Sequence, residues 1–116
     1  MEIAVKRAYD SYAPEDGYRV LVDRLWPRGI SRENLKADLW FKDVAPSNAL
    51  RKQFHHGEMF WEDFAEAYRQ ELEKAPEALE RLREALKGRR KVTLLYGAKD
   101  PEHNQAVILR NILLKH

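Results

Sequence analysis

The segment covering residues 22–29 brings together four side chains that are suited to ligand binding. Asp23 supplies a carboxylate, Arg24 and Arg28 supply guanidinium groups, and Trp26 supplies an indole. Planar guanidinium groups form paired hydrogen bonds with carboxylate or phosphate, and an indole stacks on a ring or covers a site. A structural interpretation stays open, in which Asp23 pairs with Arg24 or Arg28 to brace the loop and Trp26 fills the core.

A second polar segment, residues 96–104, holds the other candidate ligand-binding residues, Tyr96, Lys99 and Asn104. Asp100 is expected to cap a helix whose first residue is Pro101. The free amides and the dipole at such a helix start attract anions, and Lys99 adds a full positive charge. In the alternative, the acidic residues of the segment already satisfy the helix start, and the arrangement is structural.

Two residues are candidates for catalysis, and neither has a partner assigned by the sequence. His103 is best placed for proton transfer because the unperturbed pKa of histidine lies near working pH. Asp23 is the second candidate, as a base. Asn104 is suited to hold a substrate carbonyl or to orient the loop. A plain surface role for His103 is the alternative, so the catalytic residues stay unknown.

The sequence predicts no metal ion and no cofactor. His55 and His56 are adjacent, and neighbours in a helix point about 100° apart, so one metal ion would fit them poorly. The chain has no HExxH spacing, no Walker lysine motif and no glycine triplet, which are the usual zinc and nucleotide fingerprints. The basic run at residues 89–91 is short for tracking a phosphate backbone.

Hydrophobic periodicity places both polar segments after predicted strands. Residues 91–96 form the strongest strand, residues 19–23 form a second apolar strand, and residues 3–7 form an edge. Capping residues and helical spacing predict helices at residues 32–35 (capped by Ser31), 48–54 (capped by Ser47), 60–72, 76–87 and 101–114. Most aromatic side chains of the helix over residues 60–72 are expected in the core, with Trp61 as the exposed one.

This order of elements favours an α/β fold, in which a small, mostly parallel sheet carries helices packed on it. An α+β arrangement is the alternative. Ligands of open α/β sheets bind beyond the carboxyl ends of the strands. We therefore expect the loops that follow residues 23 and 96 to meet and to form any site.

Composition describes a single domain, residues 1–116, of a size that closes one hydrophobic core. The chain has no cysteine, which excludes disulfides, thiolate metal sites and a cysteine nucleophile and suits a reducing compartment. No signal peptide or membrane-spanning run is found, so we expect a cytoplasmic protein without membrane contact. Charged residues make up 34% of the chain but sum to +2, which weakens the case for nucleic-acid binding.

Three segments together resemble the YeaO-like family of bacteria and archaea, a family of unknown function. They are residues 17–29, residues 46–55, and residues 93–106. The resemblance spans nearly the whole chain and implies the fold, but it implies no reaction, cofactor or substrate. The family's pattern falls on Asp23, Arg24, Trp26, Pro27, Arg28, Gly29, Tyr96, Lys99 and Asn104.

Two classes of function fit these observations, and whether the protein is an enzyme stays open. In the first, Arg24, Arg28 and Lys99 hold a small ligand with a phosphate or carboxylate, a class that includes nucleotide-like ligands. In the second, a non-enzymatic module binds nucleic acid or a protein through Trp26, Arg28, Trp61 and the basic run at residues 89–91. The sequence does not predict the oligomeric state.

Overall fold

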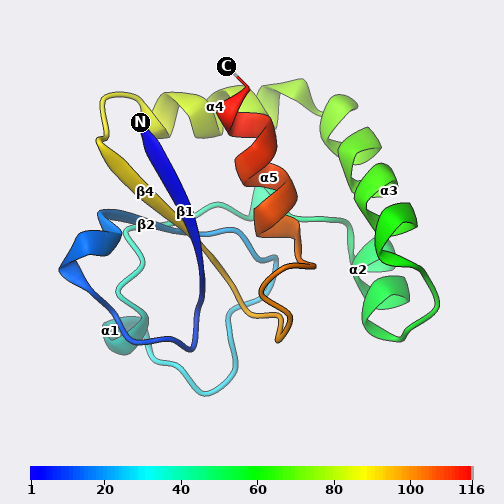
Figure 1. The fold of residues 1–116 in the computed structure, drawn as a ribbon, viewed down its shortest axis with the longest axis horizontal. Coiled ribbons are helices and arrows are strands. Elements are labelled where there is room, and N and C mark those ends of the chain that lie inside the picture. The colour runs from blue at the N-terminus through cyan, green and yellow to red at the C-terminus, as the bar shows by residue number, and fades with distance from the viewer. Residues whose placement is uncertain (116) are drawn as a thin grey trace.

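The computed structural model describes residues 1–115 and has one four-stranded sheet in which every pair of strands is parallel. The strands are β1 (Glu2–Arg7), β2 (Tyr18–Leu21), β3 (Leu39–Trp40) and β4 (Lys91–Tyr96), and Figure 1 labels β1, β2 and β4. Their order across the sheet is β1-β4-β2-β3. The expected α/β fold is therefore confirmed, and the sheet is parallel throughout its described strands.

The central strand is β4, which pairs with β1 on one side and with β2 on the other. The register runs from Glu2 opposite Lys91 to Arg7 opposite Tyr96, and from Tyr18 opposite Val92 to Leu21 opposite Leu95. Residues 92–96 are all buried, as a continuous apolar run predicts for a strand covered on both faces. The carboxyl ends of β2 and β4 consequently lie side by side.

All five predicted helices are present, and the first four match their predicted bounds to within one residue at each end. They are α1 (Arg32–Leu35), α2 (Asn48–His55), α3 (Trp61–Glu73), α4 (Pro76–Leu86) and α5 (Gln105–Leu114), with short 3-10 turns η1 (Pro14–Asp16) and η2 (Lys42–Val44). The side chains of Ser31 and Ser47 accept backbone N–H bonds from Asn34 and Leu50, which confirms both predicted caps. Within residues 1–115, no helix combines the length and apolarity needed to cross a bilayer.

The predicted start of the last helix was wrong. Asn104, not Asp100, is the N-cap of α5, and its side-chain oxygen accepts the N–H of Val107. The Asp100 carboxylate instead accepts the N–H groups of Glu102 and His103 in a separate turn before the helix. A carboxylate that satisfies these local amides stabilises a turn rather than a helical start. His103 and Asn104 therefore precede the helix and do not belong to its first turn.

Two further elements differ from the prediction. Strand β2 ends at Leu21 rather than at residue 23, although the N–H of Val22 still donates to the Leu95 carbonyl oxygen at 3.1 Å. The two-residue edge strand β3 was not predicted, because so short a pairing leaves no periodic signal in the sequence.

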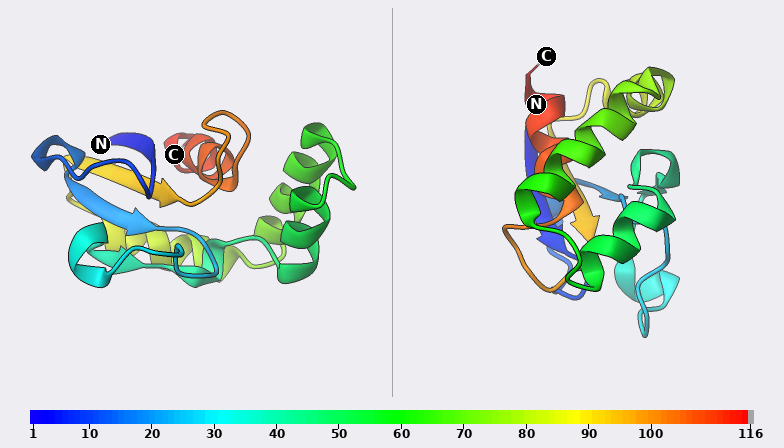
Figure 2. Two further views of the ribbon diagram at one scale, coloured as in Figure 1. Left: turned by 90° about the horizontal axis from the view of Figure 1, so that it is seen from below. Right: turned by 90° about the vertical axis from the view of Figure 1, so that its right-hand side faces the viewer.

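The helices α2 to α5 share one core with alternate residues of the sheet. Figure 2 shows α2 and α3 standing to one side of the strands, while α5 packs against β1 and β4. The sheet contributes one face to this core, through Ile3, Val20, Val22, Val92, Leu94 and Tyr96. Phe64 and Tyr68 of α3 are buried in it, whereas Phe60 is 77% exposed and Trp61 is only partly exposed. The exposed aromatic residue is thus Phe60, which precedes the helix, and not Trp61.

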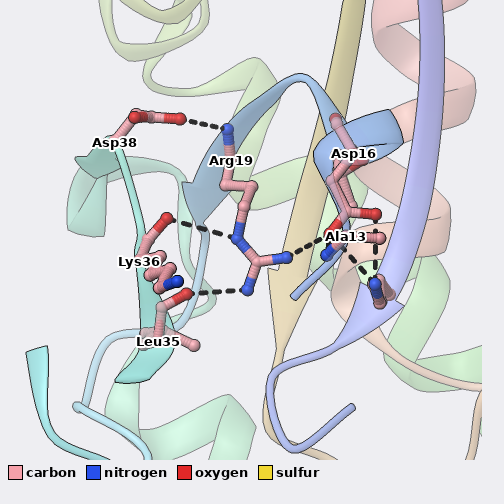
Figure 3. Close-up of polar contacts among 8 residues, drawn as sticks. Ala13, Asp16, Arg19, Leu35, Lys36 and Asp38 are labelled. Carbon is pink, nitrogen blue, oxygen red and sulfur yellow. Dashed lines mark hydrogen bonds and ion pairs between the residues drawn. The ribbon is translucent and has the colours of Figure 1, made fainter. Parts of the chain in front are cut away.

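The opposite face of the sheet is covered by a second, smaller apolar cluster that includes Leu21, Leu35 and Leu95, and by a buried arginine. Arg19 of β2 is 1% exposed, and its guanidinium donates to Asp16, to the Leu35 carbonyl at 2.7 Å and to the Lys36 carbonyl at 3.2 Å. Figure 3 shows this side chain between the Asp16 carboxylate and the end of α1. Lys6 adds a second cation, 2.9 Å from Asp16. The network ties β1, η1, β2 and α1 together.

The carboxylate of Asp16 is ionised within this network. Burial raises its pKa, but the hydrogen bonds and charge of its partners outweigh burial and leave the pKa below the usual value. The Thr93 hydroxyl of β4 also donates to the Asp16 carbonyl at 2.7 Å. The Arg19 guanidinium thus has a carboxylate and two carbonyl oxygens as acceptors, and a buried charge needs such partners.

We expect the Arg19→Met variant to lower the free energy of unfolding by about 3 kcal/mol or more, because it leaves two buried carbonyls without their side-chain donor and takes one of its cationic partners from the Asp16 carboxylate. Urea unfolding followed by circular dichroism measures the change. The matched control is Arg81→Met, which breaks the exposed pair with Asp43 at 2.8 Å and is expected to cost less than about 1 kcal/mol. Equal losses in the two variants would contradict the role given to Arg19.

Candidate functional site

A cavity of about 210 Å³ lies at the carboxyl ends of β2 and β4. The loop after β2 lines it with residues 23–28, and the loop after β4 lines it with residues 97–98 and 103–105. The remaining walls come from Pro46, from α2 and from Phe64. The two polar loops thus meet, at the edge of the sheet where open α/β folds bind ligands. In Figure 1 both loops lie beyond the arrowheads of their strands.

The Asp23 carboxylate joins the two loops. One oxygen accepts the backbone N–H of Gly97 at 2.8 Å, and the other accepts the side-chain amide of Gln105. The backbone carbonyl of Asp23 accepts the indole N–H of Trp40 at 2.8 Å. Among the described residues Asp23 forms no ion pair. The structural interpretation in which Asp23 pairs with Arg24 or Arg28 to brace the loop is therefore wrong.

Burial governs the protonation of Asp23. It raises the pKa of this carboxyl to about 6, although the hydrogen bonds from Gly97 and Gln105 and the charge of Arg51 act in the opposite direction. Partial desolvation therefore outweighs two donors and a neighbouring cation. Such a carboxyl changes charge close to neutral pH, which is a feature of functional sites and of structural networks alike.

Gly97 allows the approach of the two loops. A Cβ atom at this position would lie 2.9 Å from the Asp23 oxygen that accepts the Gly97 N–H. The backbone of Gly97 has no positive φ, so glycine is needed here for space and not for conformation.

Arg24 and Trp26 line the cavity but also hold the loop in place. Arg24 donates to the carbonyl oxygens of Pro46 at 3.1 Å and of Ala45 at 3.2 Å. The Trp26 indole donates to the Ile30 carbonyl at 2.6 Å, and its ring packs edge-to-face on Trp40 with centroids 5.2 Å apart. Arg24 and Trp26 therefore stabilise the loop through these hydrogen bonds and also line the cavity.

Arg28 and Arg51 complete the positive lining of the cavity. Arg28 is exposed at the rim. Arg51 of α2 donates to the Asn48 side chain at 3.2 Å, and its buried Nε has no hydrogen-bond partner among the described residues. Burial lowers the pKa of His55, and the charge of Arg51 lowers it further. An arginine with an unused buried donor beside a cavity is the feature that the sequence analysis missed.

The signal for Arg51 was weak in the sequence. The apolar face of α2 carries Leu50 and Phe54, and Arg51 lies one residue after the first and three residues before the second. At this spacing a helical side chain borders the apolar face, where a charged group requires a partner or a ligand. A search for charged residues at the border of apolar faces would have found it.

The residues of the second loop are distributed over three environments. Asn104 is 1% exposed and lines the cavity, but its amide caps α5 and donates to the Asp100 carbonyl at 2.9 Å. His103 also lines the cavity, and its Nδ1 lies 3.0 Å from the Asp100 carboxylate. Tyr96 is buried in the core, and Lys99 lies in an adjacent open hollow. Of the predicted ligand-binding residues, Tyr96 and Lys99 are therefore absent from the cavity wall.

The basic run at residues 89–91 lies at the opposite end of β4. Arg89 stacks over the Tyr18 ring at 3.8 Å, and Lys91 pairs with Glu2 at 3.3 Å. The strand separates this run from the cavity by about 17 Å, at roughly 3.3 Å for each residue. The basic run and the cavity do not form one continuous surface. Within residues 1–115, no three His, Asp or Glu side chains cluster closely enough to hold a metal ion.

Comparison with known proteins assigns the family. A family model described as "Inactive DUF488-N3 subclade" matches residues 2–116. The chain belongs to this DUF488-N3 subclade. It is 43% identical to the uncharacterized protein YeaO of Escherichia coli (strain K12) over 97% of each chain. It is 40% identical to the uncharacterized protein Rv3073c of Mycobacterium tuberculosis (strain ATCC 25618 / H37Rv), over 96% of this chain and 92% of the relative.

These relatives confirm the resemblance to YeaO-like proteins and extend it over the full cavity. The matched region contains both loops and α2, so the cavity of this DUF488-N3 chain lies wholly inside the family's domain. No solved structure matches the chain.

The Asp23→Asn variant tests the buried carboxyl. Folding raises the pKa of Asp23 from 3.8 to about 6, so the native state binds the proton more tightly, and this group's stabilising effect is lost as pH rises from 4 to 6. We expect the stability of the parent protein, relative to Asp23→Asn, to fall by up to about 3 kcal/mol over that range. Denaturant unfolding at several pH values measures it, and a pH-independent difference would contradict the assignment.

A Gly97→Ala substitution tests the close approach of the loops. We expect it to lower the free energy of unfolding by about 1–3 kcal/mol, because the added methyl group meets the Asp23 carboxylate. In an Asp23→Ala background the oxygen is gone, so the same substitution should cost distinctly less. Equal costs in both backgrounds, measured as a double-mutant cycle, would show that Gly97 is needed for another reason.

Proposed function

We propose that this protein binds a small molecule through its phosphate or carboxylate, in the cavity at the carboxyl ends of β2 and β4. The observation that carries the proposal is the buried Nε of Arg51, which has no partner among the described residues and belongs to a side chain of the cavity wall. An unsatisfied buried donor is unfavourable, and an anion accepting from it would remove that cost.

The charge of the cavity supports an anion as the ligand. Three arginines, at positions 24, 28 and 51, face one carboxyl group, that of Asp23. Arg24 uses its Nε and one terminal nitrogen for backbone carbonyls, which leaves further guanidinium donors, because each guanidinium carries five N–H groups. The Asp23 oxygens already accept two donors, so this residue acts in the proposal as a brace.

We propose binding without catalysis. The chain has no cysteine, and in this proposal Asp23 and His103 hold the loops rather than transfer protons, since each is engaged by a neighbour at the cavity. The description of the matching subclade as inactive points the same way. The lack of cysteine also fits a reducing compartment, and we propose the cytoplasm as the site of action.

The test measures binding of inorganic phosphate by isothermal titration calorimetry. We expect the parent protein to bind phosphate and the Arg51→Gln variant to bind it about tenfold more weakly or worse, because charge-assisted hydrogen bonds to the anion are lost. The matched control is Lys52→Gln, which removes the same charge from the next residue of α2, outside the cavity wall.

Chloride at the same ionic strength serves as the control for general screening. The proposal is overturned when the parent protein binds no phosphate or carboxylate probe above the chloride background. It is also overturned when Lys52→Gln weakens binding as much as Arg51→Gln does, because the attraction would then come from net charge alone.

A further inference from the structure

An open hollow adjoins the cavity and continues it toward solvent. The two share the residues Phe54, His55, Gly97, Ala98 and His103 along their walls. The hollow adds Trp61 at the start of α3 and the pair Lys99 and Asp100. A ligand bound beside the arginines of the cavity would therefore extend into the hollow, whose wall also includes an aromatic ring and a pair of oppositely charged residues.

The floor of the hollow is aromatic and held in place by packing. The Trp61 ring lies 4.9 Å from the His103 ring and 5.8 Å from the Phe54 ring, measured between centroids. Phe54 stacks on the buried Phe64 at 4.4 Å, and the Nδ1 of the half-exposed His103 lies 3.0 Å from the Asp100 carboxylate. Packed rings with part of their surface exposed offer a flat apolar area on which a ligand ring can stack, and the packing of Phe54 and Trp61 lowers the ordering cost of such a contact.

We infer that the ligand carries an aromatic or heteroaromatic ring next to its anionic group. The ring lies on the surface formed by Phe54, Trp61 and His103, and the phosphate or carboxylate enters the cavity beside Arg51. This inference rests on the proposed function and adds the class of ligand, of which aryl phosphates and nucleotides are examples. Lys99 and Asp100 both line the hollow, so charges of both signs border the ring and the arginines remain the main attraction for the anion.

The experiment compares two probes that share a phosphate, phenyl phosphate and methyl phosphate, by isothermal titration calorimetry. We expect the parent protein to prefer phenyl phosphate by about tenfold, the effect of stacking one ring on aromatic side chains. The Trp61→Ala variant should lose this preference and keep its affinity for methyl phosphate. Trp61→Phe should retain part of the preference, because it keeps a ring.

The matched control is Phe60→Ala, which removes the neighbouring exposed ring outside the hollow and should leave both affinities unchanged. Equal binding of the two probes by the parent protein would overturn the inference and leave the proposed function standing. Binding of neither probe would overturn both. Loss of both probes in Trp61→Ala, with a normal circular dichroism spectrum, would also overturn the inference, because Trp61 would then not act on the ring alone.

Discussion

The Asp23 carboxylate holds the candidate site together. Its two oxygens connect the end of β2 to the backbone after β4 and to the first residue of α5, and its own carbonyl binds Trp40 of β3. Within residues 1–115, no other hydrogen bond or ion pair joins the loop after β2 to the loop after β4. Burial raises the pKa of this carboxyl to about 6, so the junction exists at an electrostatic cost.

Arg19 has the corresponding role on the face of the sheet that lacks long helices. Parallel strands are normally connected by a helix, but the connection from β1 to β2 contains only the 3-10 turn η1. The guanidinium of Arg19 fills the resulting space and satisfies Asp16 and the end of α1. One buried cation thus joins the apolar cluster of Leu21, Leu35 and Leu95 in covering one face of the sheet, while one buried carboxylate connects the loops at its carboxyl edge.

Strong local signals made most of the fold predictable. Each of these elements was predicted from a local pattern: β4 from its apolar run, α1 and α2 from their serine caps, and α3 and α4 from the helical spacing of their apolar residues. The start of α5 was predicted wrongly because two residues compete for the N-cap position. Asp100 and Asn104 both have side chains suited to capping, and only the folded turn decides between them. The meeting of the two loops followed from the parallel sheet. Arg51 had only a weak local signal, its place beside the apolar face of α2, and the packing of α2 is what brings it to the cavity.

The position of β4 in the sheet has a consequence for synthesis. β1 and β2 leave the ribosome early, yet neither pairs with the other, because β4 lies between them. Until the last strand of the described chain emerges, both present unpaired edges that invite association with other nascent polypeptides. Strand β1 therefore has no partner in the sheet until β4 emerges, whereas β2 can pair with β3 before then, so the sheet is complete only once β4 is available.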